Sequence, residues 1–299
     1  LTVDSLLCGS DLGGTKIEIA LCDPAKPAEA LLRRRYDTAA HLGYEQILAR
    51  ISSLVAEAEE ISGRRRPARI GIGTPGAVDP ATGELKNSNT TCLNGRPLRQ
   101  NLAEILGCEI TMANDANCFT LAEALWGAGK GEDLVLGLIL GTGVGGGIVL
   151  NGQLLEGASG NAGHIGHVIV EPNGRRCACG GRGCLEAEAS GPAIEAITGR
   201  SPTQPTYEIM VRTGRLVGRG VASVCNLLDL QLVCVGGSVA LGFGATFFNS
   251  AQRTLDELCG LEFSRGARII PSRLADQGGL IGAAAVGWRG LNRMASSPH

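Results

Sequence analysis

The hydrophobic pattern of this 299-residue chain alternates between strand-like runs and helix-like stripes. An apolar run from Leu6 enters a glycine turn at residues 11–16, and a second run at 17–21 returns from it, which predicts an antiparallel hairpin. Apolar residues then recur at intervals of three and four; they are Ile47, Ile51, Leu54, Val55, Ala58 and Ile61. This spacing predicts an amphipathic helix that ends at Gly63.

The same order of strand, glycine turn and strand returns in the second half of the chain. A strand at 134–140 leads into the turn 141–147, and a strand at 148–150 follows. Further strands are expected at 69–73, 109–113, 232–235 and 268–270, and helices at 98–106, from 114 to 126, at 207–228 and from about 279. The alternation predicts two similar α/β halves, with ligands in the crevice between them.

Composition narrows the range of partners. Glycine accounts for 45 residues, about twice the usual share of roughly 7 %. The net charge of −2 gives no overall positive field, so we expect neither nucleic acid nor a membrane surface as a partner. Two local arginine runs, Arg33–Arg35 and 64–66, are interpreted as solvated surface rather than anion sites.

Cysteine usage and the first residues suggest the compartment. The chain has 11 cysteines, most of them single residues in apolar stretches, where a free thiol behaves as a small hydrophobic side chain. No basic segment with a small-residue cleavage site precedes Asp11, and no apolar run approaches the roughly 18 residues that a membrane span needs. These features predict a cytoplasmic protein.

The two glycine turns are candidate phosphate sites. Residues Asp11, Gly13, Gly14, Thr15 and Lys16 form the first, and Gly141, Thr142 and Gly143 form the second. Their glycines are expected to take positive φ and to present backbone amides to an anion, although two plain hairpins explain each turn equally well. Neither turn has the spacing of a Walker or Rossmann motif. Together they favour a polyphosphate, with Mg²⁺ held by Asp11 through water and with Gly236 and Gly237 near the nucleoside of ATP.

Asp115 is the candidate catalytic base. It follows the strand at 109–113 and starts the next helix, where a carboxylate is commonly an N-cap. A sugar kinase needs a carboxylate beside the attacking hydroxyl, and the end of a central strand can supply one. Asn114 can exchange hydrogen bonds with the hydroxyls of a polyol.

A metal site is predicted from His167, Cys177, Cys179 and Cys184. Three thiolates and one imidazole on a glycine-rich loop match a closed, structural zinc site; free loop cysteines are the weaker alternative. His164 competes for the fourth position, and we assign it to the pocket or to a residue that supports a ligand. Glu186 follows the cluster, either turned towards substrate or simply starting the next helix at the surface.

Taken together, these motifs resemble the ROK family of bacterial sugar kinases and repressors. The match runs in order through the turn 11–16, the loop 71–76, Asn114–Asn117, the turn 140–147, residues 163–167 and the block 177–186. The resemblance implies a two-domain, actin-like ATPase fold of the ribonuclease H-like type, with an interdomain cleft and a zinc loop. The N-terminal domain would comprise residues 1–118 and the helix at 283–299, and the C-terminal domain would comprise residues 119–282.

The resemblance also implies the reaction: transfer of the γ-phosphoryl of ATP to a hexose hydroxyl, usually the 6-OH, with Mg²⁺, a structural Zn²⁺ and a homodimer. Asp115 would be the general base. The expected sugar contacts are Gly76, Asn89, Asn114, His164, His167 and Glu186, of which His167 would also bind zinc. Glucose, fructose, mannose and the N-acetylhexosamines are the candidate acceptors.

One departure from the family pattern concerns the sugar. Family hexokinases usually carry Glu where this chain has His164, and some N-acetylmannosamine kinases carry His, so N-acetylmannosamine is an alternative acceptor. In contrast, residues 87–95 and 114–123 look more like fructokinases and N-acetylglucosamine kinases. A sugar-sensing repressor is a second alternative, which the ten residues before Asp11 disfavour because they cannot hold a DNA-reading domain.

Overall fold

The computed structural model describes residues 6–23, 26–63, 69–79, 81–88 and 90–289. The expected sugar contact Asn89 and the arginine run 64–66 lie outside these residues. The chain divides into two compact units: unit 1 comprises Leu1–Ala122, Glu156–Gly160 and Gln277–His299, and unit 2 comprises Glu123–Leu155 and Asn161–Asp276. The domain boundaries after residues 118 and 282, and the cleft between the domains, stay predictions.

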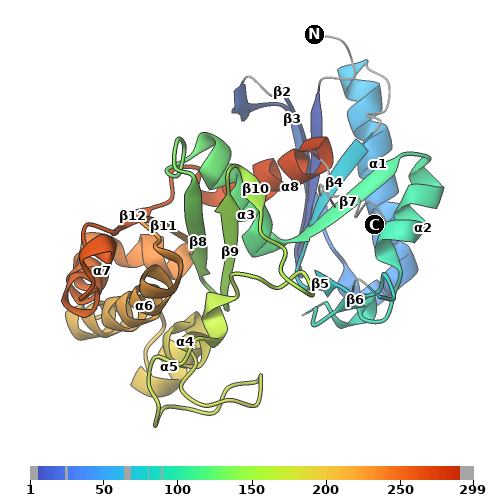
Figure 1. Ribbon diagram of the computed structural model, residues 1–299. Coiled ribbons are helices and arrows are strands. Elements are labelled where there is room, and N and C mark those ends of the chain that lie inside the picture. Colours follow the sequence, from blue (N-terminus) through green and yellow to red (C-terminus); the bar gives the residue numbers. More distant parts are fainter. Residues whose placement is uncertain (1–5, 24–25, 64–68, 80, 89, 290–299) are drawn as a thin grey trace. The chain divides into compact units, whose positions relative to one another are not determined.

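Unit 1 is built on a five-stranded sheet with the order β3-β2-β1-β4-β7 (Figure 1). Its strands are β1 (Leu7–Leu12), β2 (Lys16–Asp23), β3 (Lys26–Asp37), β4 (Arg69–Thr74) and β7 (Glu109–Asn114). Strands β1, β2 and β3 are antiparallel neighbours, whereas β1, β4 and β7 run parallel. The predicted first hairpin is therefore confirmed.

Helices cover both faces of this sheet. They are α1 (Tyr44–Ser62), α2 (Leu98–Leu106), the start of α3 (Asp115–Trp126) and α8 (Gly278–Arg289). Helices α1 and α2 lie on one face, where Ile47 and Ile51 pack with Leu12 and Ile72 in a single apolar cluster. The predicted amphipathic helix is confirmed, and Gly63 ends it in the left-handed conformation. Smaller elements complete the unit: β5 (Ala77–Val78), β6 (Leu85–Lys86), η2 (Ala40–Leu42) and η3 (Thr91–Leu93).

Helix α8 covers the opposite face of the sheet at a backbone distance that only glycine permits. A Cβ on Gly71 would lie 1.8 Å from the carbonyl oxygen of Ala283, and one on Gly9 would lie 2.3 Å from the amide nitrogen of Ala284. A Cβ on Gly282 would lie 1.7 Å from the carbonyl oxygen of Cys118. At these three positions glycine therefore serves close packing and not a turn.

Unit 2 repeats this architecture with the strand order β10-β9-β8-β11-β12. Its strands are β8 (Leu134–Leu140), β9 (Val144–Leu150), β10 (Gln153–Leu154), β11 (Leu232–Gly236) and β12 (Arg268–Pro271). An antiparallel hairpin, β8–β9, is again followed by two parallel strands. The predicted duplication of the α/β half is confirmed.

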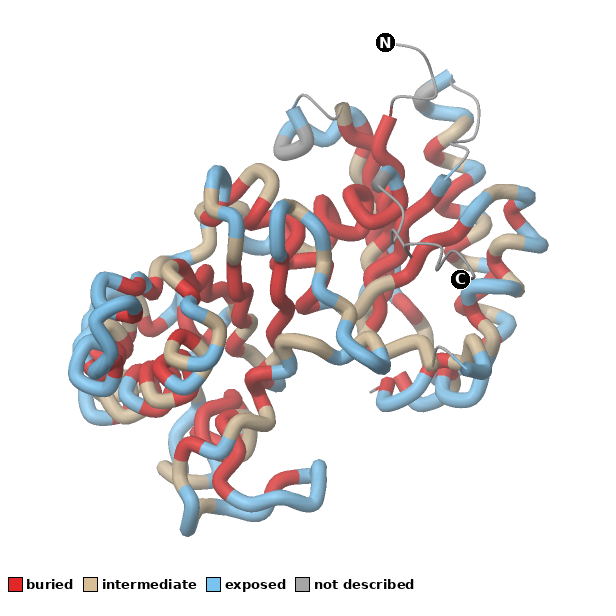
Figure 2. The backbone as a smooth tube through the Cα atoms, in the orientation of Figure 1, coloured by how far each residue is buried: buried red, intermediate tan, exposed pale blue. Residues whose placement is uncertain are grey.

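The core of unit 2 lies between its sheet and a helical layer. The helices are α4 (Leu185–Ala189), α5 (Gly191–Thr198), α6 (Tyr207–Leu228) and α7 (Ser238–Leu258), and the single helical turns are η4 (Ile165–His167), η5 (Glu262–Ser264) and η6 (Ala275–Gln277). Leu136, Leu138 and Leu140 of β8 point into this layer, where they meet Val217 of α6 and Phe247 of α7. Figure 2 shows the buried residues concentrated on the strands and on the inner sides of the helices of each unit.

Two expectations from the sequence need correction here. The glycines at 145–147 belong to strand β9, which begins at Val144, and not to the preceding turn. Gly146 is required by packing, because a Cβ there would lie 2.5 Å from the carbonyl oxygen of Gly163. The run Arg33–Arg35 is not simply solvated: Arg33 and Arg34 are half-buried, and all three residues form ion pairs. Among the described residues, no helix is both long enough and apolar enough to cross a membrane.

Candidate functional site

The parallel strands of unit 1 end together at one edge of the sheet. Asp11 of β1 lies opposite Gly73 of β4, and Thr74 of β4 lies opposite Asn114 of β7. Helix α3 begins with Asp115, directly after β7. Ligands in α/β proteins bind at the carboxyl ends of such strands, so this edge is the place where the polar residues of unit 1 can meet a substrate.

Asp115 is the first residue of α3, directly after the N-cap position of Asn114, and it is open to solvent. Its Oδ1 accepts a hydrogen bond from the amide of Ala116 at 2.7 Å, and Oδ1 of Asn114 accepts from the same amide at 3.0 Å. The side chain is nevertheless exposed. The partial loss of water around it raises the pKa of the carboxyl, and the hydrogen bond from Ala116 offsets this only in part. The N-cap is therefore Asn114 rather than Asp115, and the exposed carboxylate of Asp115 is accessible to a ligand.

Asp11 is the second carboxylate of this edge. Burial and the negative charge of Asp115 raise its pKa from 3.8 to about 6, while Arg33 and Arg35 act in the opposite direction. Its Oδ1 lies close to Gly73, 3.4 Å from the position that a Cβ on that glycine would take. A hard divalent cation between the carboxylates of Asp11 and Asp115 would stabilise the ionised form of both side chains. The two residues therefore fit Mg²⁺ held through water.

The first glycine turn lies between β1 and β2. The amide of Gly13 donates to the carbonyl of Lys16 at 2.8 Å, and Thr38 binds the turn twice, through its hydroxyl to the carbonyl of Gly13 and through its amide to the carbonyl of Thr15. Gly14, Thr15 and Lys16 are exposed at the tip. The expectation of positive φ is wrong for Gly13 and Gly14. Gly13 is required instead because a Cβ would lie 2.9 Å from the carbonyl oxygen of Lys16.

In unit 2 the second glycine turn lies beside the start of helix α7. Gly141 and Gly143 also lack positive φ, whereas Gly237, the N-cap of α7, has a φ of 93°. A Cβ on Gly141 would lie 3.7 Å from the hydroxyl of Ser238, and one on Gly237 would lie 2.3 Å from the carbonyl oxygen of Leu140. The structure therefore brings together the turn with Thr142 and the pair Gly236–Gly237, as the sequence predicts for one nucleotide site.

Glu186 connects the second glycine turn to the metal loop. It lies in the first turn of α4, two residues after the N-cap Cys184, and its carboxylate accepts a hydrogen bond from the amide of Val144 at 2.9 Å. A Cβ on Gly143 would lie 2.9 Å from the same carboxylate oxygen. Glu186 is thus half-buried and fixed, and not a free surface residue.

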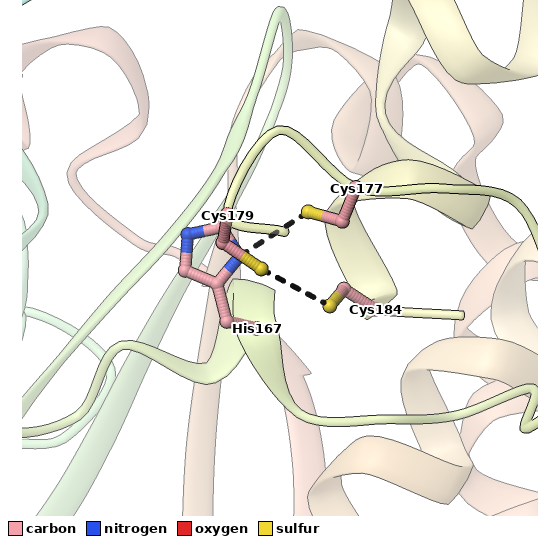
Figure 3. Close-up of side chains that lie close together, drawn as sticks. All are labelled: His167, Cys177, Cys179 and Cys184. Atoms are coloured by element: carbon pink, nitrogen blue, oxygen red, sulfur yellow. Dashed lines mark hydrogen bonds between the residues drawn. The ribbon is translucent and has the colours of Figure 1, made fainter. Parts of the chain in front are cut away.

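His167, Cys177, Cys179 and Cys184 converge as predicted (Figure 3), with all their ligand atoms within 4.8 Å of one another. The Sγ atoms of Cys179 and Cys184 are 3.7 Å apart, and Nδ1 of His167 is 3.6 Å from Sγ of Cys177. A tetrahedral zinc ion with the usual bond lengths has ligand separations of about 3.8 Å between sulfurs and about 3.6 Å between sulfur and nitrogen. The donor set and its spacing therefore fit zinc.

His164 lies beside this cluster and not in it. Its ring is 4.8 Å from the ring of His167, in an edge-to-face arrangement, and it is exposed. Partial burial and the neighbouring His167 lower the pKa of His164, and Glu186 acts in the opposite direction. His164 is thus near Glu186 and His167, which are the other residues of unit 2 that the sequence assigns to the sugar.

Sequence reasoning missed two residues at the edge of unit 1. The hydroxyl of Thr90 is buried without a hydrogen-bond partner among the described residues, and it is 3.6 Å from the position of a Cβ on Gly14. The Sγ of Cys118 is 3.4 Å from the position that a Cβ on Gly73 would take. Burial and the charges of Asp11 and Asp115 raise the pKa of the Cys118 thiol. The serine- and threonine-rich stretch around residue 90 was the available signal for Thr90; Cys118 gave none.

Comparisons with known proteins agree with these features. The family model described as "ROK family" matches residues 7–288. A glucokinase from Thermotoga maritima is 32 % identical over 94 % of this chain and 96 % of its own length, and an N-acetyl-D-glucosamine kinase from Salmonella paratyphi B is 33 % identical over 92 % and 97 %. The crystal structure of a ROK hexokinase from Thermus thermophilus superposes with a TM-score of 0.81 at 32 % identity, covering 95 % of this chain and 98 % of that one.

The chain therefore belongs to the ROK family. The prediction of a sugar kinase of this family is confirmed.

Proposed function

We propose that the protein transfers the γ-phosphoryl group of ATP to the 6-OH of a hexose, with Asp115 as the general base. The broad activity, that of an ATP-dependent hexose kinase, follows from the similarity to sugar kinases of the family. The observation that carries the assignment of Asp115 is its position: it is exposed at the carboxyl end of β7, next to Asp11. An ionised carboxylate there can orient a hydroxyl and accept its proton as the bond to phosphorus forms.

The nucleotide contacts are proposed from both glycine turns. Asp11 would hold Mg²⁺ through water, and the metal would supply charge neutralisation at the phosphates. In unit 1, Gly13, Gly14, Thr15 and Lys16 would provide amide, hydroxyl and ammonium donors. In unit 2, Gly141, Thr142 and Gly143 would face the phosphates, and Gly236 and Gly237 would lie near the nucleoside. The exposure of residues 14–16 and the proximity of Gly141 to the start of α7 support these contacts.

The sugar contacts are proposed at Gly76, Asn89, Asn114, His164, His167 and Glu186. In unit 1, the side-chain amide of Asn114 donates to the carbonyl of Gly76 at 3.3 Å, and this proximity supports a common sugar site for the two residues. In unit 2, Glu186, His164 and His167 are neighbours. The two similar relatives, a glucokinase and an N-acetyl-D-glucosamine kinase, favour glucose or N-acetylglucosamine as the acceptor.

N-acetylmannosamine is the second candidate acceptor, because His164 stands where family hexokinases usually carry Glu. A carboxylate accepts hydrogen bonds from two hydroxyls, whereas a neutral imidazole offers one donor and one acceptor. The lowered pKa of His164 favours the neutral ring, so the contacts with the sugar differ from those of a carboxylate.

Zinc is proposed as a structural ion on His167, Cys177, Cys179 and Cys184, with no open position for chemistry. The arrangement supports a positioning function: Cys184 is the N-cap of α4, and Glu186 follows in the first turn. A homodimer and a cytoplasmic location are likewise proposals, favoured by the family resemblance and by the use of ATP.

The test is a phosphorylation screen with purified protein, ATP and Mg²⁺ over glucose, mannose, fructose, N-acetylglucosamine and N-acetylmannosamine. ADP release reports turnover, and phosphorus NMR of the product identifies the phosphorylated hydroxyl. We expect sugar-dependent ADP release and a 6-phosphate with glucose or N-acetylglucosamine. Phosphorylation confined to another hydroxyl, or no turnover with any of these sugars, would contradict the proposal.

A further inference from the structure

A short antiparallel hairpin, residues 175–183, carries two of the three cysteines that converge in Figure 3. The amide of Gly183 donates to the carbonyl of Arg175 at 2.8 Å and closes the base of this hairpin. The third cysteine, Cys184, follows the hairpin directly and is the N-cap of α4. The contacts that fix the hairpin to the rest of unit 2 therefore decide where the thiols lie.

Glu188 of α4 contacts both ends of the hairpin, and its side chain is only 3 % exposed. Its Oε1 accepts a hydrogen bond from the amide of Arg175 at 2.6 Å, and its own amide donates to the carbonyl of Cys184 at 3.2 Å. A Cβ on Gly174 would lie 2.3 Å from the same Oε1, so the chain that enters the hairpin passes directly against the carboxylate.

Arg212 of α6 fixes the side chain of Glu188. Its Nη2 donates to Oε2 of Glu188 at 2.7 Å, and its Nη1 donates to the backbone carbonyl of Glu188 at 2.8 Å. Each carboxylate oxygen thus has its own partner, the Arg175 amide on Oε1 and the guanidinium on Oε2. A buried ion pair of this kind adds little to stability against an apolar pair, but loss of one partner leaves an uncompensated buried charge. We therefore look for its purpose in the geometry that it fixes.

A second arginine of α6 supports the base of the hairpin from the other side. Arg219 lies about two helical turns after Arg212, on the same side of α6. Its Nη1 donates to the carbonyl of Val170 at 3.2 Å and to Oε2 of Glu171 at 3.0 Å. The amides of Val170 and Glu171 in turn donate to the carbonyl of Gly183. The side chains of Arg219 and Glu171 are 37 % and 41 % exposed, so we expect this pair to contribute less than the buried one.

We propose that Glu188 and Arg212 are positioning residues for the metal site. Their buried ion pair fixes the hairpin to α4 and α6 while the four ligand atoms lie within 4.8 Å of one another, so the ligands need little rearrangement to bind the metal. Neither residue has to touch the metal. The inference rests on the proposed structural zinc for its purpose, and the contacts themselves are a property of the chain.

The test uses substitutions in the full chain as purified. Glu188→Ala removes both carboxylate contacts, Glu188→Gln keeps an oxygen for the amide of Arg175, and Arg212→Gln leaves the carboxylate without its guanidinium. The double variant, Glu188→Gln with Arg212→Gln, leaves no unpaired buried charge and keeps the test available if a single variant does not fold. Arg215→Gln is the matched control, because Arg215 is an exposed arginine of the same helix.

The first readout is the affinity for zinc, measured by competition with a chromogenic chelator. We expect Glu188→Ala, Arg212→Gln and the double variant to bind zinc roughly 10- to 100-fold more weakly, the usual effect of losing a residue that orients metal ligands. Glu188→Gln should lie between these variants and the wild type, and Arg215→Gln should equal the wild type. Wild-type affinity in Glu188→Ala and Arg212→Gln, or an equal loss in Arg215→Gln, would overturn the inference.

The second readout is hydrogen exchange of segment 171–184, followed by mass spectrometry. It separates a local effect from a general loss of stability, because segments that open locally exchange independently of the core. In Glu188→Ala and Arg212→Gln, exchange of this segment should accelerate roughly 10- to 100-fold, the value of a charged hydrogen bond, and that of β8 and β11 much less. Equal acceleration in the segment and in these strands would overturn the inference.

Failure of this inference and failure of the proposed function give different results. A wild type that takes up no zinc would contradict the proposed metal site. The exchange comparison needs no metal, and it would still decide whether Glu188 and Arg212 fix the hairpin. A wild type that binds zinc, with variants of the same affinity, would contradict only the positioning function.

Discussion

The carboxylate of Glu186 accepts a hydrogen bond from the backbone amide of Val144 at 2.9 Å. Glu186 is the second residue of α4, whose N-cap is Cys184, the last cysteine of the metal cluster. Val144 starts β9 directly after the second glycine turn. One side chain therefore connects the metal loop to the proposed phosphate turn within unit 2. This contact suggests that the metal loop positions the glycine turn through Glu186.

Two substitutions separate the charge of Glu186 from its hydrogen bond. Glu186→Gln keeps an acceptor for Val144 and removes the charge, whereas Glu186→Ala removes both. If the carboxylate binds sugar, both variants should raise the KM for sugar by roughly 10- to 100-fold, the value of a charged hydrogen bond. A KM that rises only for Glu186→Ala would assign Glu186 to holding the turn. Glu195→Gln, on the exposed surface of α5, is the control.

The metal cluster predicts zinc at about one equivalent per chain. Cys179→Ser should lose the metal and lower the free energy of unfolding by more than about 4 kcal/mol, because structural metal binding contributes directly to folding. Cys179 is exposed, so the loss cannot be attributed to a core cavity. Cys92→Ser, at a half-buried position outside the cluster, should change neither property. Metal analysis and thermal unfolding give both results, and a metal-free protein of full stability would contradict the site.

The close packing of α8 on its sheet predicts that one added methyl group at Gly71 lowers the stability of the fold strongly. Gly71→Ala would place a Cβ 1.8 Å from the carbonyl oxygen of Ala283. The backbones must separate, and we expect a loss of about 3 kcal/mol or more in the free energy of unfolding. In contrast, Gly242→Ala, in the first part of α7, meets no atom within 4 Å and should stabilise the protein by about 0.5–1 kcal/mol. Urea unfolding of both variants distinguishes close packing from general intolerance of alanine.

The raised pKa of Asp11 predicts how stability depends on pH. Its pKa in the folded, ligand-free protein is about 6 and its ordinary value is 3.8, so the folded state binds the proton more tightly. This stabilisation is present below pH 3.8 and is lost as the pH rises through about 6. Asp11→Asn should therefore be more stable than the wild type at pH 7.5, by about 1–2 kcal/mol after allowance for partial exposure.

The difference between Asp11→Asn and the wild type should shrink towards pH 4, as measured by thermal unfolding without nucleotide or metal. Asp79→Asn provides a control of opposite sign, because the ion pair with Lys86 lowers the pKa of Asp79. A wild type that is more stable than Asp11→Asn at pH 7.5 would contradict the environment described for Asp11.

The periodicity of the sequence was sufficient to predict the repeated elements of both units. The hairpin at Asp11 and its counterpart at Gly141, the helix that ends at Gly63 and the metal cluster all follow from local spacing. The sequence did not show, however, why glycine is required at particular positions. Gly13 and Gly146 are required because a Cβ would clash with the carbonyl oxygens of Lys16 and Gly163, and not because of a positive φ. A sequence does not show which backbone atoms approach each other.

Residues whose importance depends on neighbours across the sheet were also missed. The run Arg33–Arg35 reads as solvated charge, because a linear pattern does not show that β2 places Glu18 between Arg33 and Arg35. Register and topology supply this information, and they arise from packing rather than from local propensity.

The exposed carboxylate of Asp115 is the centre of this account, and Asp115→Asn tests it most directly. The variant keeps the size of the side chain and an oxygen that accepts from the amide of Ala116, so helix α3 and the fold should persist. We predict a fall in kcat of about 100- to 10,000-fold with the sugar dissociation constant unchanged within about threefold, while Asp256→Asn on the exposed surface of α7 retains full activity. An Asp115→Asn enzyme with a kcat near that of the wild type would contradict the account.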